Sequence, residues 1–165
     1  MNHVSDDATI IQFYDQLFEI ASSIIKRGET HAPIVLALNT SGGVRGLSLS
    51  GLHPDERASL FFAMAARPEV RAAALIIESW YVEGAPTDSA VGSALELAQQ
   101  GRLYEHPARQ EAIVVSIMTS NRQAVMVCPI DRATNSLQKR PFQWLCDRPE
   151  HVVGRYIRSA PHTMH

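Results

Sequence analysis

The sequence predicts an α+β domain, a two-layer sandwich in which two main helices pack on a mostly antiparallel five-stranded sheet. Two pairs of apolar segments are each joined by a turn of only a few residues, which indicates antiparallel hairpins. Two other segments show the 3.6-residue spacing of amphipathic helices. The regular strand–helix alternation of a doubly wound nucleotide-binding fold is missing, so this fold is excluded.

The two main helices are predicted from apolar spacing and from residues typical of helix ends. Residues 7–26 form a long helix whose apolar face is wide enough to pack on a sheet, or on a sheet and a second subunit. Residues 53–70 form the second, with Pro54 at its first position and an end near Pro68. We expect its buried face to contain Leu60, Phe61, Met64 and Ala65.

The strands follow from short apolar runs bounded by turn residues. Residues 33–40 and 44–52 pair as one hairpin, and residues 111–130 form another that Pro129 ends. Residues 72–83 supply a fifth strand between them. The segment 90–103 is expected as a weaker, short helix because it is rich in small residues and glycine.

The length of 165 residues is sufficient for one sizeable core. We expect a single domain over residues 1–130 and a partly docked C-terminal extension over 131–165, where the periodicity fades. Within the extension, Pro141–Leu145 is apolar enough to dock on the body, and residues 158–165 resemble a frayed end.

Composition and charge narrow the function classes. The formal net charge of −2 provides no basic surface for phosphates, which disfavours nucleic acid as the main partner. No apolar run reaches the length of about 18 residues that a membrane span needs, and the first residues do not resemble a signal peptide. We therefore expect a cytoplasmic protein that does not associate with membranes.

Metal and disulfide sites have no support in the sequence. The two cysteines form no CxxC pair, and the histidines show neither HxH nor HExxH spacing. We expect no metal and no cofactor. Cys128 lies in the apolar stretch AVMVC and is expected to be a core residue.

Glu78 is the most unusual residue of the chain, because it interrupts the apolar stretch AAALIIESWYVE. On a strand it shares one face with Ile76 and Trp80, and the opposite face is also apolar, so we expect a central strand covered on both sides. An unpaired buried carboxylate is costly. Glu78 is therefore expected to be protonated or to meet a cation.

The expected cation lies in the segment HPARQE. A strand that begins at Glu111 can lie beside the strand of Glu78, which would bring Arg109 or His106 close to that carboxylate. Arg132, after the last strand of the second hairpin, is expected to form only a solvated turn pair with the preceding aspartate.

The segments IIESWYVEG and HPARQEAIVVSIMTSNRQAVMV together resemble a group of uncharacterised bacterial and phage proteins. These have an apolar strand ending in Glu-x-Trp, a His-Pro-x-Arg-x-Glu phrase and a closing hairpin. The resemblance covers about residues 72–130. It implies a small bacterial or phage cytoplasmic protein, and it implies no activity.

Two functions stay open at this point. The first is a non-enzymatic binding or assembly protein that forms a homodimer or higher oligomer, or binds another protein, and in which Glu78 belongs to a structural ion pair. The alternative is a small enzyme or ligand pocket in which Glu78 is the acid or base, Arg109 holds an anionic group and His106 moves a proton. Its ligand-binding candidates are Trp80, Tyr81, Arg57 and Glu111.

Overall fold

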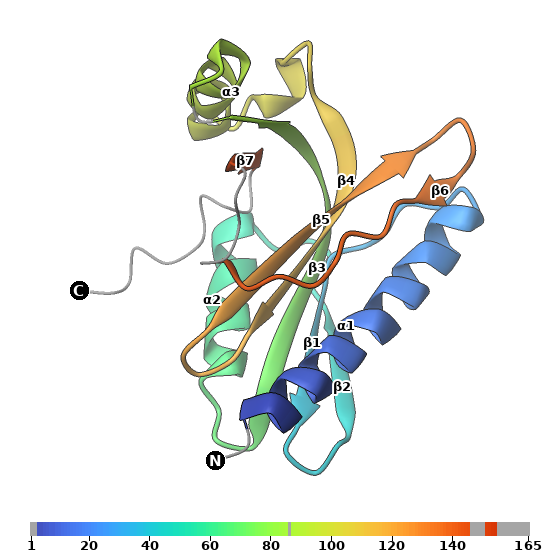
Figure 1. The fold of residues 1–165 in the computed structure, drawn as a ribbon, viewed down its shortest axis with the longest axis vertical. Helices are drawn as coiled ribbons and strands as arrows, with labels where there is room; N and C mark the ends of the chain where they lie inside the picture. Colours follow the sequence, from blue (N-terminus) through green and yellow to red (C-terminus); the bar gives the residue numbers. More distant parts are fainter. Residues whose placement is uncertain (1–2, 86, 146–150, 155–165) are drawn as a thin grey trace.

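The fold was obtained as a computed structural model, which describes residues 3–85, 87–145 and 151–154, with side chains over 6–85 and 87–145 (Figure 1). The helices are α1 (His3–Lys26), α2 (Pro54–Ala65), α3 (Ser89–Gln99) and the short 3₁₀ helix η1 (Leu103–Glu105). The strands are β1 (Ile34–Asn39), β2 (Val44–Ser48), β3 (Val70–Gly84), β4 (Gln110–Met118), β5 (Gln123–Asp131), β6 (Ser136–Leu137) and β7 (His151–Gly154).

The sheet is antiparallel throughout. Six strands lie in the order β2-β1-β3-β4-β5-β6, and β7 pairs with the far end of β3. This confirms the α+β class and both hairpins, β1–β2 and β4–β5. The prediction of five strands was wrong, because β6 and β7 have only two and four residues and are too short to show a periodic pattern.

Helices cover both faces of the sheet, so the described residues form three layers instead of two (Figure 1). Alternate residues of β3 point to opposite faces. Ala74 and Ile76 pack against α1, whereas Leu75 and Ile77 pack in the cluster that contains Phe61 of α2. The sequence predicted that this strand is covered on both sides, which α1 and α2 confirm.

The third helix is a regular element and not a weak one. Asp88 caps α3 by accepting a hydrogen bond from the backbone of Ala90 at 2.9 Å. Gly84 allows the helix to approach closely, because a Cβ atom there would lie 2.9 Å from Val91 Cγ2. Together with η1, α3 buries the far end of β3 in a separate apolar cluster.

Of two finer predictions, the one for Leu60 was wrong and the one for Pro129 is confirmed. Leu60 is 37% exposed, while Phe61 and Ala65 form the buried face of α2. Pro129 ends the β4–β5 ladder as predicted, because its pair with Ala112 is the last of that register, although β5 itself continues to Asp131 and pairs there with β6. The carbonyl of Pro129 accepts a hydrogen bond from Gln138 on the other side, so the missing N–H also faces away from β4.

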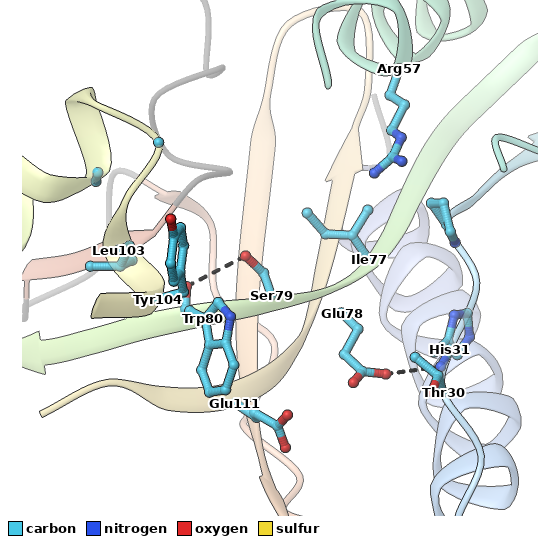
Figure 2. A pocket seen from close by; sticks show the side chains of 13 residues that line it. Thr30, His31, Arg57, Ile77, Glu78, Ser79, Trp80, Leu103, Tyr104 and Glu111 are labelled. Carbon is cyan, nitrogen blue, oxygen red and sulfur yellow. Dashed lines mark hydrogen bonds between the residues drawn. The ribbon is translucent and has the colours of Figure 1, made fainter. Parts of the chain in front are cut away.

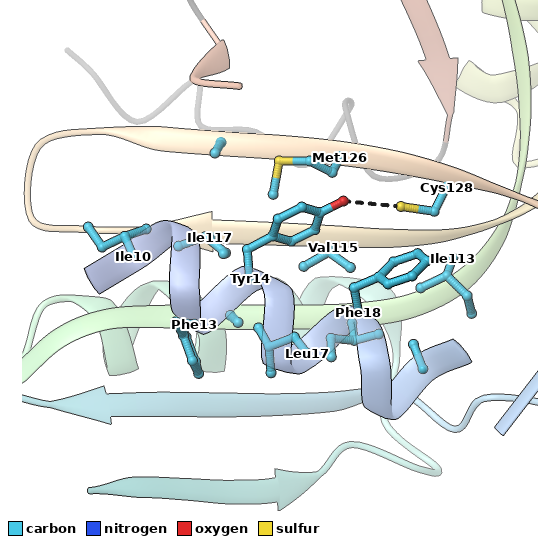
Figure 3. Close-up of a cluster of buried hydrophobic side chains, with 14 of the residues drawn as sticks. Ile10, Phe13, Tyr14, Leu17, Phe18, Ile113, Val115, Ile117, Met126 and Cys128 are labelled. Carbon is cyan, nitrogen blue, oxygen red and sulfur yellow. Dashed lines mark hydrogen bonds between the residues drawn. The ribbon is translucent and has the colours of Figure 1, made fainter. Parts of the chain in front are cut away.

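The larger core cluster lies between α1 and the β3–β4–β5 face (Figure 3). Tyr14 of α1 reaches into it and donates a hydrogen bond to the carbonyl of Arg140 at 2.5 Å, with Cys128 Sγ at 3.5 Å. Burial raises the pKa of the Cys128 thiol. The prediction that Cys128 is a core residue is confirmed.

Residues that follow β5 also pack on this body. Trp144 is buried, forms an isolated bridge with Ala124 and contacts Phe142 edge to face. The predicted docking of Pro141–Leu145 is thus confirmed by Trp144. Residues 158–165, predicted to be a frayed end, lie outside the described residues, and the division of the chain at residue 130 stays a prediction.

The long strand β3 has two different neighbours on one edge. Its first part, Val70–Ile76, pairs with β1, and its last part, Tyr81–Gly84, pairs with β7, while β4 follows the opposite edge. Between them, residues 77–80 have no strand partner on that edge among the described residues. We call this stretch the open edge of β3.

Candidate functional site

A cavity of about 390 Å³ lies at the open edge of β3 (Figure 2). Its walls come from the loop before β1, the first turns of α2, the open edge itself, the end of α3 with η1, and the start of β4. The polar and aromatic residues that line it are Thr30, His31, Arg57, Glu78, Ser79, Trp80, Tyr104 and Glu111. Its size is that of a pocket for a small ligand.

Residues from both faces of the sheet line the cavity, at the edge where residues 77–80 have no strand partner in the described chain. Figure 2 shows Arg57, Ile77 and Ser79 on one side of β3, and Glu78 and Glu111 on the other. The strand pleat causes this division, since successive side chains alternate between faces. Trp80 and Glu111 are directly paired across β3 and β4. They also line a second, more open hollow next to the cavity.

The cation that Glu78 meets is Arg132, not Arg109 or His106. Arg132 Nη2 binds Glu78 Oε1, and Arg132 Nε donates to Glu111 Oε2 at 2.9 Å. The Glu78 side chain is only 16% exposed. The prediction of a solvated turn pair for Arg132 was wrong, because β5 continues beyond Pro129 and carries this arginine toward the Glu78 side of β3.

A second hydrogen bond holds the other oxygen of Glu78. The backbone N–H of His31 donates to Glu78 Oε2 at 2.9 Å (Figure 2). Each oxygen of this carboxylate therefore has a hydrogen-bond donor, the N–H of His31 or the guanidinium of Arg132. This arrangement favours a structural ion pair for Glu78 over a carboxylate that is free to contact a ligand.

His31 lines the cavity beside Glu78 and was not singled out from the sequence. Its Nδ1–H donates to the carbonyl of Ala32 at 2.7 Å, which leaves Nε2 as the unprotonated ring nitrogen. Burial lowers the pKa of His31, partly offset by the Ala32 carbonyl and by Glu78. The ring is therefore neutral at neutral pH. A single histidine in a turn gives no sequence signal for this position.

Arg57 differs from most other arginines of the described chain because it has no ion-pair partner there. Its Nε is buried and finds no hydrogen-bond acceptor among the described residues. The side chain extends from α2 toward the cavity and the open edge (Figure 2). A buried donor without an acceptor is unfavourable unless a ligand or water supplies one.

The other candidates from the sequence lie nearby but outside the cavity lining. His106 is buried, accepts the N–H of Ala108 at Nδ1 and contacts Ser93 Oγ through Nε2 at 2.9 Å. Arg109 lies over the ring of Trp80, 5.1 Å from its centroid. Tyr81 is buried and donates to Gln110 at 2.9 Å.

Four of the seven candidate residues thus line the cavity, namely Glu78, Trp80, Arg57 and Glu111.

The described residues contain no group of three or more histidine, cysteine or acidic side chains that could hold a metal ion. None of the described helices is long and apolar enough to cross a membrane. Comparison with protein-family models, curated proteins and solved structures found no match. The geometry of the cavity is therefore the basis for a function.

Proposed function

We propose that this protein binds a small anionic ligand in the cavity at the open edge of β3. The observation that carries the proposal is Arg57, a guanidinium that lines the cavity without an ion-pair partner in the described chain and with a buried Nε. A carboxylate or phosphate there would accept hydrogen bonds from the guanidinium, whose planar donors match such groups.

The walls of the cavity support a ligand with a ring or another apolar part. Trp80 and Tyr104 line it together with Ile77 and Leu103. Pockets for small molecules combine such apolar walls with a few placed polar groups. Tyr104 is half exposed, which leaves its ring available for contact.

Binding is favoured over acid–base catalysis by Glu78, His106 and Arg109. Glu78 is held by Arg132 and by the backbone of His31, and both nitrogens of the His106 ring have partners within the chain. These residues therefore provide no free acid–base pair directed at a common point.

The test is a titration with 3-phenylpropanoate, a small anion with one ring. Binding is measured by calorimetry and by the NMR signal of the indole N–H of Trp80. We expect saturable binding that weakens at least about tenfold in Arg57→Gln, which is the loss of a charge-assisted hydrogen bond. Arg67→Gln is the matched control, since Arg67 lies just after the end of α2 but pairs with Glu69 at the surface. Equal binding by wild type and Arg57→Gln would contradict the proposal.

Self-association is a second candidate, and strand β2 favours it. All five residues of β2 are exposed at the end of the sheet, and Val44 and Leu47 are each 47% exposed. An edge strand with apolar side chains is suited to pairing with a second copy of itself. Sedimentation equilibrium should then give a dimer that Leu47→Lys converts to a monomer. A wild-type monomer at about 100 μM would exclude this interface.

A further inference from the structure

We infer that the ligand is a zwitterion of amino-acid or dipeptide size, with its anionic group at Arg57 and its ammonium group at Glu111. This inference rests on the proposed function and specifies the ligand. It comes from the distribution of charge on the two sides of β3 at the open edge.

On one side, two carboxylates share a single guanidinium. Arg132 binds both Glu78 and Glu111, and their side chains are 16% and 28% exposed. Both oxygens of Glu78 accept hydrogen bonds, from Arg132 and His31. For Glu111 only Oε2 accepts one from the described residues, so Oε1 remains available to a donor. This side therefore has capacity for a further cation.

The nearby cation Arg109 does not fill that capacity. It lies over the Trp80 ring and donates to the carbonyl of His106 at 3.1 Å, and it forms no ion pair with either carboxylate among the described residues. His31 is neutral because burial lowers its pKa. An ammonium group is thus the charge that complements Glu111 within the cavity.

On the other side, Arg57 is a cation without an anionic partner among the described residues. Arg57 of α2 and Glu111 of β4 lie on opposite sides of β3 although both line one cavity (Figure 2). A ligand with one charge would satisfy only one side. A molecule that carries both charges would satisfy both, and about 390 Å³ is enough for an amino acid or a dipeptide.

The open edge adds a reason to include a dipeptide. Every second residue of 77–80 directs its backbone N–H and C=O toward the edge that lacks a strand partner in the described chain. A peptide bond can pair with such groups as an added strand does. A free amino acid cannot, so the two ligands are distinguishable by affinity.

The experiment compares four probes by calorimetry on the full chain. L-Phenylalanine differs from 3-phenylpropanoate only by its ammonium group, phenethylamine lacks the carboxylate, and glycyl-L-phenylalanine adds a peptide bond. We expect L-phenylalanine or the dipeptide to bind at least about tenfold more tightly than either singly charged probe. Tighter binding of the dipeptide than of L-phenylalanine would identify the peptide as the ligand class.

Glu111→Gln should remove the advantage of L-phenylalanine over 3-phenylpropanoate while leaving the anion bound. Its control is Glu83→Gln, because Glu83 is also 28% exposed and paired with an arginine, Arg140, but does not line the cavity. Circular dichroism checks that each variant is folded.

The outcomes separate the two proposals. If 3-phenylpropanoate binds as tightly as the zwitterions and Arg57→Gln weakens it, the anion site stands and the zwitterion is refuted. If none of the four probes binds to folded wild-type protein, both proposals are refuted. If Glu83→Gln reduces the preference for L-phenylalanine as much as Glu111→Gln does, the assigned ammonium site is wrong.

Discussion

Replacing Arg132 by methionine tests whether the Arg132–Glu78–Glu111 cluster stabilises the fold. Methionine keeps most of the aliphatic stem and removes the guanidinium, so both carboxylates lose their cation while packing is largely retained. Glu78 would then depend on the N–H of His31 alone for its hydrogen bonding within the described chain.

The size of the effect follows from burial. An ion pair at the surface contributes about 0–1 kcal/mol, and removing one partner of a buried pair costs about 3–5 kcal/mol. Glu78 is 16% exposed, which places it toward the buried case, but Arg132 is 36% exposed and is screened by solvent. We therefore expect Arg132→Met to lower the free energy of unfolding by about 2 kcal/mol.

The assay is urea denaturation at pH 7, with the midpoint converted through a shared m-value. Arg27→Met is the matched control, since Arg27 pairs with Glu29 at 3.0 Å with both side chains 56% exposed, and we expect no measurable change. A double-mutant cycle with Glu78→Gln should give a coupling energy of about 1 kcal/mol. If Arg132→Met has no larger effect than Arg27→Met, the cluster does not stabilise the fold and the burial argument is refuted.

Three further predictions concern buried polar groups. Tyr14→Phe should lower stability by about 1–2 kcal/mol because the carbonyl of Arg140 loses a donor, and an unchanged urea midpoint would contradict this. In a Cys146→Ser background, Cys128 should react with a thiol reagent only after unfolding, since burial raises its pKa; rapid labelling of the native protein would exclude a core position. Because burial lowers the pKa of His31 below its usual value of about 6.5, the unfolded chain binds more protons, and stability should fall as pH drops below about 6.5. His31→Asn should flatten this dependence between pH 7.5 and 5.5, and an identical slope in the two proteins would refute the assignment.

Local periodicity predicted most of the regular structure. The 3.6-residue spacing of apolar residues predicted α1, and the two sets of alternate residues in β3 face opposite sides as predicted. Both patterns are reliable because backbone geometry sets the direction of each side chain. The pairing of Trp80 with Glu111 was also within reach, since a strand starting at Glu111 was expected beside β3. Short elements such as β6 and β7 carry no such pattern.

The composition of the cavity could be predicted only in part. Arg132 is 54 positions from Glu78, and its role depends on how far β5 extends relative to β3, which no local pattern encodes. An arginine at a solvated turn and an arginine in a site look the same in sequence. The lack of an ion-pair partner for Arg57 among the described residues and the open edge of β3 likewise arise only when β1, β7 and α2 are placed together.

The interruption along one edge of β3 has a consequence for amide hydrogen exchange. Amides of Val70–Ile76 and Tyr81–Gly84 lie within paired ladders, and those of 77–80 that face β4 are also protected. The alternate amides of 77–80 that face the opposite direction should exchange with solvent much faster than their neighbours on both sides. One strand would thus show a fast-exchanging centre between two slow ends, and slowing of those few amides would report directly that the cavity is occupied.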